Sequence, residues 1–297
     1  MHIPDGILSA PVLASFGAAS AAGIAISARR AESLTEARRI PLLGVLGAFV
    51  FAAQMVNFPV GPGASGHLLG GALLAVTLGP WAATITMTAI LLVQALVFQD
   101  GGVLALAANV FNMALLGVWS AWWAYRGLER LGQVRLGVFV AAFLSVTLSA
   151  GLALAQVVVS GAELSPGLVF FCGGLFVVTG LIEGAITVAA WEAIAKLEGR
   201  STEPKRLLWP ILAASGVVML VGVFFASQSP DVLEVFNEKT GAASRSRELF
   251  AGLLPDYEWR TLPWEWLGKT MAGLVGLLLL YGVSMLLVRL MPKQPQE

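Results

Sequence analysis

The sequence predicts an all-α integral membrane protein with about nine transmembrane helices. Of its 297 residues, 57% are hydrophobic and only 12% are charged, and the mean hydropathy is +0.81. A soluble domain carries about a quarter charged residues, so this composition indicates a chain that lies in a bilayer. Apolar runs of about 20 residues recur along the sequence, and a helix of that length crosses the hydrocarbon core. Because the net charge is zero, we expect the lipid bilayer and no nucleic acid as a partner.

Nine apolar segments account for the expected spans. They cover residues 8–28, 41–58, 67–79, 81–98, 102–124, 136–159, 167–194, 207–227 and 269–289. The third holds about 12 residues, or ~18 Å of helix, which is too short for a core of about 30 Å. We therefore expect the preceding "VGPGASGH" to enter the membrane from outside as irregular backbone, because its glycines and Pro62 interrupt a helix. This arrangement places His67 inside the bundle, where it is accessible from the outer side of the membrane.

Basic residues orient the helices, because cytoplasmic loops carry the excess of Lys and Arg. With the amino terminus outside, thirteen of the eighteen basic residues lie on the inner side. The five on the outer side are Lys239, Arg245, Arg247, Arg260 and Lys269. We therefore expect a multi-pass protein of the cell membrane, with its amino terminus outside and its carboxyl terminus in the cytoplasm.

A polar stretch at 197–206, "LEGRSTEPKR", divides the chain into two parts. Residues 1–200 hold seven of the apolar segments. Residues 201–297 hold the other two, which flank a loop of mixed charge at about 228–268. We interpret the two parts as separate modules joined by a linker.

The sequence contains two histidines, His2 and His67, and the predicted topology puts both on the outer side. The Met1 amine, the His2 backbone nitrogen and His2 Nδ1 form two fused chelate rings around one metal ion, nearly in one plane. His67 can then occupy the open fourth position. Four nitrogens in a plane suit Ni2+ or Cu2+, whereas Zn2+ prefers a tetrahedron. The terminus and the buried loop together therefore predict a metal site.

The residues after His2 favour this arrangement. Pro4 disfavours helix at Ile3 and keeps the terminus extended, and the turn at Asp5 and Gly6 can fold it back towards the bundle. Two plainer interpretations stay open. The terminus can be disordered, and His67 can simply form a hydrogen bond to a neighbouring helix.

Three segments, "MHIPDGIL", "AAQMVNFPVGPGASGHLLGGALLAVTLGPWAA" and "VQALVFQDGGVLALAANVFNM", closely resemble one known family. It is the NikM/CbiM family, the membrane substrate-binding component of nickel/cobalt energy-coupling-factor (ECF) transporters. The resemblance covers about residues 1–200 and implies an ECF S-component-like bundle of about seven spans. It implies that Met1, His2 and His67 bind Ni2+ or Co2+ as the transported substrate, with no permanently bound cofactor.

The second part carries its own resemblance. "SPDVLEVF" at 229–236 is similar to the small N-type (PDGLE-like) partner component, although Val232 stands where glycine usually follows the Pro-Asp pair. The chain thus resembles a fused M–N protein with an M-type metal-binding domain at 1–200 and an N-type module at 201–297. The family resemblance also implies a transmembrane coupling (T) subunit and cytoplasmic ATPase (A) subunits as partners.

Other polar and small residues are candidates for supporting roles. A stripe of small residues on the first span suits close helix contact, with the coupling subunit or within the chain; it consists of Ala10, Ala14, Ala18 and Ala22. Polar residues near the expected site can orient the metal ligands or form generic hydrogen bonds between helices; they are Asp5, Gln54, Asn57, Ser65 and Asn109. Asp100, with Gly101 and Gly102, predicts a structural turn on the outer side.

The motifs of common hydrolases, such as HExxH and GxSxG, do not occur in the sequence. We therefore expect a transporter subunit and not an enzyme, with ATP hydrolysed by a separate polypeptide. A metal-sensing or storage membrane protein is the alternative. An intramembrane hydrolase is a second rival, and Glu183 is its best candidate residue because intramembrane carboxylates are commonly functional. Glu183 is expected near the middle of the seventh span, away from the metal site, where a protonated carboxyl group that only packs between helices is an equally good interpretation.

Overall fold

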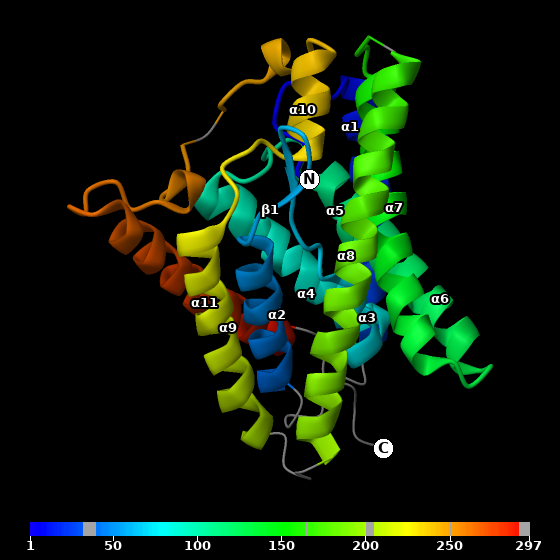
Figure 1. The fold of residues 1–297 in the computed structure, drawn as a ribbon, viewed down its shortest axis with the longest axis vertical. Coiled ribbons are helices and arrows are strands. Elements are labelled where there is room, and N and C mark those ends of the chain that lie inside the picture. Colours follow the sequence, from blue (N-terminus) through cyan, green and yellow to red (C-terminus); the bar gives the residue numbers. More distant parts are fainter. Residues whose placement is uncertain (32–39, 164, 200–204, 250, 291–297) are drawn as a thin grey trace.

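The structure is a computed structural model that describes residues 1–31, 40–163, 165–199, 205–249 and 251–290, and it is a bundle of helices (Figure 1). The amino-terminal part contains α1 (Ala10–Arg30), α2 (Ile40–Gln54), β1 (Phe58–Gly61), β2 (Ala64–Gly66), α3 (Gly71–Leu78), α4 (Pro80–Val93), η2 (Gln94–Phe98), α5 (Leu106–Val110), η3 (Phe111–Gly117), α6 (Val118–Glu129), α7 (Val134–Val159) and α8 (Pro166–Gly199). The carboxyl-terminal part contains α9 (Lys205–Phe225), α10 (Val232–Lys239), η4 (Ala242–Arg245), η5 (Pro255–Tyr257) and α11 (Glu265–Leu290).

Helices occupy all nine predicted apolar segments, but their lengths differ. Among the described residues, six helical stretches are long and apolar enough to cross a membrane: Ala10–Arg30, Pro80–Phe98, Val134–Val159, Pro166–Leu197, Leu207–Phe225 and Glu265–Ser284. The helix of the second segment is shorter, at Pro41–Gln54, and α3 has only eight residues. In the fifth segment, α5 and α6 are joined by η3, which is π-helical. The chain is therefore a helical membrane protein with several spans, as its composition predicts.

Glycine and proline set the ends of the short helix α3. Gly70 precedes it with a φ of +72°, and Gly79 follows it with a φ of +79°, a left-handed region that only glycine adopts without strain. Pro80 then begins α4, where its fixed φ fits the first turn and its missing N–H costs no hydrogen bond. These breaks turn the chain twice within a few residues and leave α3 enclosed among its neighbours.

The segment "VGPGASGH", expected as irregular backbone, contains a two-stranded antiparallel hairpin. Phe58 pairs with Gly66 and Pro59 with Ser65, and Gly63 lies in the turn with a φ of +67°. The hairpin packs on α8 so closely that a Cβ added at Gly66 would lie 2.8 Å from Thr179 Oγ1. Its second strand runs directly into His67, so the hairpin and α8 together fix where that side chain begins.

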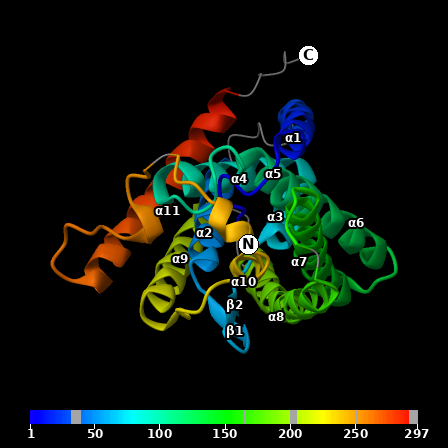
Figure 2. The same ribbon diagram turned by 90° about the horizontal axis from the view of Figure 1, so that it is seen from above.

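The carboxyl-terminal helices pack against the amino-terminal part and are not held by a linker alone. Helix α2 lies between α9 and α11, while α7 packs against both α6 and α8 (Figures 1 and 2). Helix α10 lies next to α8 and the hairpin, close to the amino terminus (Figure 2). The end of the bundle that holds the amino terminus is therefore built from both parts of the chain.

Helix α1 leaves its predicted small-residue stripe open. All four residues of the stripe are exposed; they are Ala10, Ala14, Ala18 and Ala22. The packing of this stripe inside the chain, one of the two sequence-based interpretations, is therefore not what the structure shows.

Candidate metal-binding site

The amino terminus is buried in the bundle. Met1 is 5% exposed and Ile3 is fully buried. The side-chain amide of Asn109 pairs with the backbone of Ile3 in both directions, since its Oδ1 accepts the Ile3 N–H at 2.9 Å and its Nδ2 donates to the Ile3 carbonyl at 3.0 Å. The N–H of Gly102 donates to the same carbonyl at 3.0 Å. Asn109 thus holds the extended terminus much as a neighbouring strand would, and the structure does not place this terminus in solvent.

Asp5 fixes the turn that brings the terminus inside. Its carboxylate accepts three backbone hydrogen bonds, from Val103 at 2.9 Å, Leu104 at 2.8 Å and Ala105 at 3.0 Å. These N–H groups precede α5, where free backbone donors favour an anion. Asp5 therefore does not contact the candidate metal donors of Met1 and His2. It anchors the amino-terminal segment that carries them.

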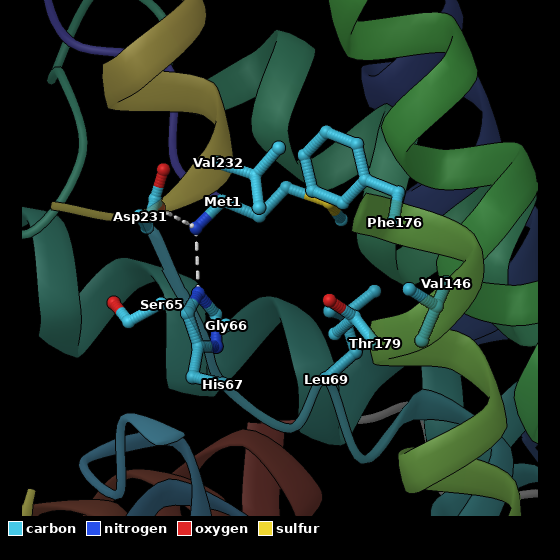
Figure 3. A pocket seen from close by; sticks show the side chains of 10 residues that line it. All are labelled: Met1, Ser65, Gly66, His67, Leu69, Val146, Phe176, Thr179, Asp231 and Val232. Atoms are coloured by element: carbon cyan, nitrogen blue, oxygen red, sulfur yellow. Dashed lines mark hydrogen bonds and ion pairs between the residues drawn. The ribbon is translucent and has the colours of Figure 1, made fainter. Parts of the chain in front are cut away.

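His67 lies against the terminal amine. The Met1 nitrogen is 2.5 Å from His67 Nε2 (Figure 3). His67 Nδ1 donates to the Leu68 carbonyl at 3.0 Å. Because Nδ1 carries the proton, Nε2 keeps its lone pair, which is the form that binds metals. His67 therefore presents a neutral nitrogen donor to the place where the amine lies.

His2 stacks on His67, with the ring centroids 5.7 Å apart and the planes 2° from parallel. Its Nδ1 lies 2.9 Å from an oxygen of Asp100, whose other oxygen accepts the Tyr257 hydroxyl at 2.5 Å. Burial alone would raise the pKa of Asp100, but the charges of His2 and the amine hold it below its usual range. The expected structural turn at Asp100 therefore has a direct contact with the candidate site. In this arrangement Nδ1 of His2 is engaged with a carboxylate and not directed at the amine.

Asp231 is the second partner of the amine. Its Oδ2 forms an ion pair with the Met1 nitrogen (Figure 3), and although burial opposes it, the charge of the amine holds the pKa of this carboxyl below its usual range. Asp231 is 230 positions from Met1 in the sequence, so local patterns could not place it here. The only sequence signal was the "SPDVLEVF" motif, whose Pro-Asp pair includes this residue.

Two buried polar residues hold the loop after His67. Gln54 donates to the Leu69 carbonyl at 2.7 Å and accepts from Gln94 at 2.8 Å. The carboxylate of Glu183 accepts the N–H groups of Leu69 at 2.7 Å and Gly70 at 2.8 Å. Glu183 lies in the middle of α8, as expected, and in addition it contacts the segment between His67 and α3 directly, which the sequence did not predict.

Ser65 and Asn57 join the site to the carboxyl-terminal part. Ser65 donates through its N–H to the Pro230 carbonyl at 2.8 Å and through its hydroxyl to the Ser229 carbonyl at 2.7 Å. The Asn57 carbonyl accepts the Ser227 N–H at 2.8 Å. Asn57, Met1, His2 and His67 also line a cavity of about 380 Å³ between the two parts of the chain. This cavity is large enough for several water molecules beside the candidate donors.

The three predicted donors therefore lie together, although no ready-made metal cage surrounds them. Within the described ranges, no group of three or more His, Cys, Asp or Glu side chains is arranged to hold a metal ion. A planar set made of an amine, a backbone nitrogen and two imidazoles does not need such a group. That these atoms ligate a metal stays a prediction.

Comparison with known proteins identifies the family. The family model of the cobalt uptake substrate-specific transmembrane region, CbiM, matches residues 2–201. The chain belongs to the CbiM family. A second model, the PDGLE domain, matches residues 205–293 of this CbiM-family chain, so Asp231 and Tyr257 both lie in the PDGLE match.

Relatives of this CbiM-family chain are metal transport proteins by name. A chain from Archaeoglobus fulgidus that carries the name of a fused nickel transport protein, NikMN, is 34% identical over 300 residues, which cover 97% of this chain and 98% of the relative. The fused nickel transport protein NikMN of Rhodobacter capsulatus is 40% identical over 117 residues, or 39% of this chain and 34% of the relative. A crystal structure of a transition metal transporter is similar with a TM-score of 0.60 at 30% identity, covering 69% of this chain and 97% of the other.

Proposed function

We propose that this CbiM-family chain is the substrate-binding membrane component of an ATP-driven ECF importer. It binds Ni2+ or Co2+ from the outer side and delivers the ion to the cytoplasm. The observation that carries the proposal is the meeting of Met1, His2 and His67: a buried amine 2.5 Å from an imidazole nitrogen, with a second imidazole stacked on the first. Met1 and His67 are 66 positions apart in the sequence, so the fold and not chain proximity brings these nitrogen donors together.

The donor chemistry supports a late divalent transition metal. The Met1 amine, the His2 backbone nitrogen, His2 Nδ1 and His67 Nε2 are four nitrogens, and borderline ions such as Ni2+ and Co2+ accept them well. Binding requires the amine and the backbone amide to lose protons, so metal uptake releases protons and is favoured by higher pH. The His2 ring must also exchange its contact with Asp100 for the ion.

The membrane arrangement in this proposal has nine spans, with the amino terminus outside and the carboxyl terminus inside. The third of these spans is α3 together with the hairpin segment that leads into it, because the eight residues of α3 alone are too short to cross. The open stripe on α1 (Ala10, Ala14, Ala18 and Ala22) supports docking of the T subunit, since small residues allow close approach of a partner helix. Cytoplasmic A subunits then supply ATP hydrolysis, residues 1–200 act as the metal-binding domain, and 201–297 act as the N-type module.

The experiment is a nickel titration of the purified protein in detergent, with the native chain compared with one that carries two residues before Met1. The extension converts the amine to an amide nitrogen and removes one donor, so nickel affinity is expected to fall by more than about 100-fold. A chain with the same two residues added after Glu297 is the matched control and should bind normally. Equal nickel affinity in all three proteins would refute the terminal-amine site.

Uptake assays then test transport itself. Radioactive nickel should accumulate in cells that express the chain together with the ATPase and coupling partners, and the His67→Ala variant should abolish the accumulation. Nickel binding without uptake, with the partners present, would favour a sensing or storage protein instead.

A further inference from the structure

Asp231 is held rigidly at the start of α10. Its Oδ1 accepts the Glu234 N–H at 2.8 Å, and its own N–H donates to Glu234 Oε2 at 2.7 Å, which is a complete capping box. The cap uses Oδ1 and leaves Oδ2 for the terminal amine. One carboxylate oxygen of Asp231 thus caps α10, and the other binds the Met1 amine.

The segment that carries Asp231 is also bonded to the strand that carries His67. The carbonyls of Ser229 and Pro230 both accept hydrogen bonds from Ser65, and Ser65 forms a parallel bridge with Asp231 itself. Gly66 alone separates Ser65 from His67. The two groups that contact the amine are therefore fixed relative to each other, and the amine lies between them (Figure 3).

The ion pair between the Met1 amine and Asp231 is buried. The Met1 and Asp231 side chains are only 4% and 16% exposed. A buried ammonium group is costly without a counter-charge and hydrogen-bond partners. His67 supplies a neutral acceptor, and Asp231 supplies the charge.

We infer that Asp231 is a positioning residue for the metal site: its carboxylate, supplied by the PDGLE part, holds the terminal amine against His67. The amine is therefore held next to His67 Nε2 before the ion binds. This inference rests on the proposed function, because positioning matters for loading only if the amine is a metal ligand. It also gives the carboxyl-terminal module a defined contribution to the site of the amino-terminal part.

Three variants separate positioning from capping. Asp231→Ser keeps a good helix cap but is too short to reach the amine. Asp231→Asn keeps the cap and the length of the side chain, but it removes the charge and places an NH2 donor where Oδ2 accepts from the amine. Glu234→Gln is the matched control, since glutamine still completes a capping box and this side chain does not contact the amine.

The first measurement does not involve metal. The metal-free proteins are treated with an amine-acylating reagent at pH 7, and modification of Met1 is followed by mass spectrometry of the amino-terminal peptide. Wild type and Glu234→Gln should react slowly, because the amine is buried and ion-paired. Asp231→Ser should react at least about fivefold faster, and Asp231→Asn should lie between them.

The second measurement is nickel affinity. Loss of a supporting partner commonly costs 10–100-fold in metal affinity, and we expect a loss of about that size for Asp231→Ser, a smaller loss for Asp231→Asn and less than about twofold for Glu234→Gln. Wild-type acylation and wild-type affinity in Asp231→Ser would overturn the inference, and so would faster acylation with unchanged affinity. If the wild type itself fails to bind nickel while acylation still separates the variants, the proposed function fails and the contact with the amine stands.

Discussion

Glu183, in the middle of α8, binds the backbone of Leu69, the second residue after His67, through a hydrogen bond of 2.7 Å. The other carboxylate oxygen accepts the N–H of Gly70 at 2.8 Å. Since α3 begins at Gly71, these are free donors at a helix start, which a carboxylate satisfies well. The fully buried position of Glu183 is thus explained by a backbone contact and does not require catalysis.

Replacing this carboxylate should loosen the loop that carries His67. Glu183→Ala leaves two buried N–H groups without an acceptor, and each such group costs roughly 1–3 kcal/mol. We expect a lower thermal unfolding midpoint in detergent and weaker nickel binding. Glu192→Ala on the same helix is the control, because Glu192 pairs with the exposed Arg135 and surface pairs contribute about 0–1 kcal/mol. Equal midpoints and affinities for the two variants would contradict this role.

Gly102 permits the amino-terminal segment to lie where it does. A Cβ at this position would collide with the backbone nitrogen and the carboxylate of Asp5. Gly102→Ala should therefore displace the segment, speed acylation of Met1 and reduce nickel affinity by more than about tenfold, as expected when supporting contacts of a metal site are lost. Gly173→Ala serves as the comparison because a Cβ there has open space around it. Unchanged nickel binding in Gly102→Ala would mean that the segment can be held in another way.

The hydroxyl of Tyr257 supports His2 through Asp100. Tyr257→Phe removes a hydrogen bond worth about 0.5–1.5 kcal/mol, and we expect a fall of a few-fold in nickel affinity. Tyr125→Phe removes the hydroxyl that donates to Glu129 at 2.8 Å, in α6 and far along the chain from the site. It should leave nickel binding unchanged while having a similar effect on stability. A titration in which both variants bind nickel like the wild type would remove Tyr257 from the site.

Several of these relationships could be predicted from sequence and others could not. The helices follow the apolar segments because a bilayer imposes length and hydrophobicity directly. The proximity of Met1, His2 and His67 could be predicted, because the chain has only two histidines and the predicted topology puts both on the outer side. The same reasoning treated Asp100 as a turn residue, since nothing local distinguishes a carboxylate that binds an imidazole from one that ends a helix.

The longer-range contacts depend on tertiary geometry. Asp231 reaches the amine because α10 packs on α8 and its preceding segment pairs with β2. Glu183 reaches Leu69 because Gly70 and Gly79 confine α3 to eight residues. The spacing of apolar residues does not reveal how deep a segment lies in the bundle or how sharply the chain turns. The partners of Asp231 and Glu183 could therefore be identified only in the structure.

The position of α2 between α9 and α11 has a consequence for how such a chain can be divided. Lipid tails are as apolar as the side chains at helix contacts, so separating these helices in a bilayer forfeits little hydrophobic energy. The contacts of Ser65, Met1 and Tyr257, by contrast, each join a polar group of one part of the chain to a specific polar group of the other. Cutting the chain between α8 and α9 should therefore give two polypeptides that each insert, and that find one another again chiefly through the few polar groups around the buried amine.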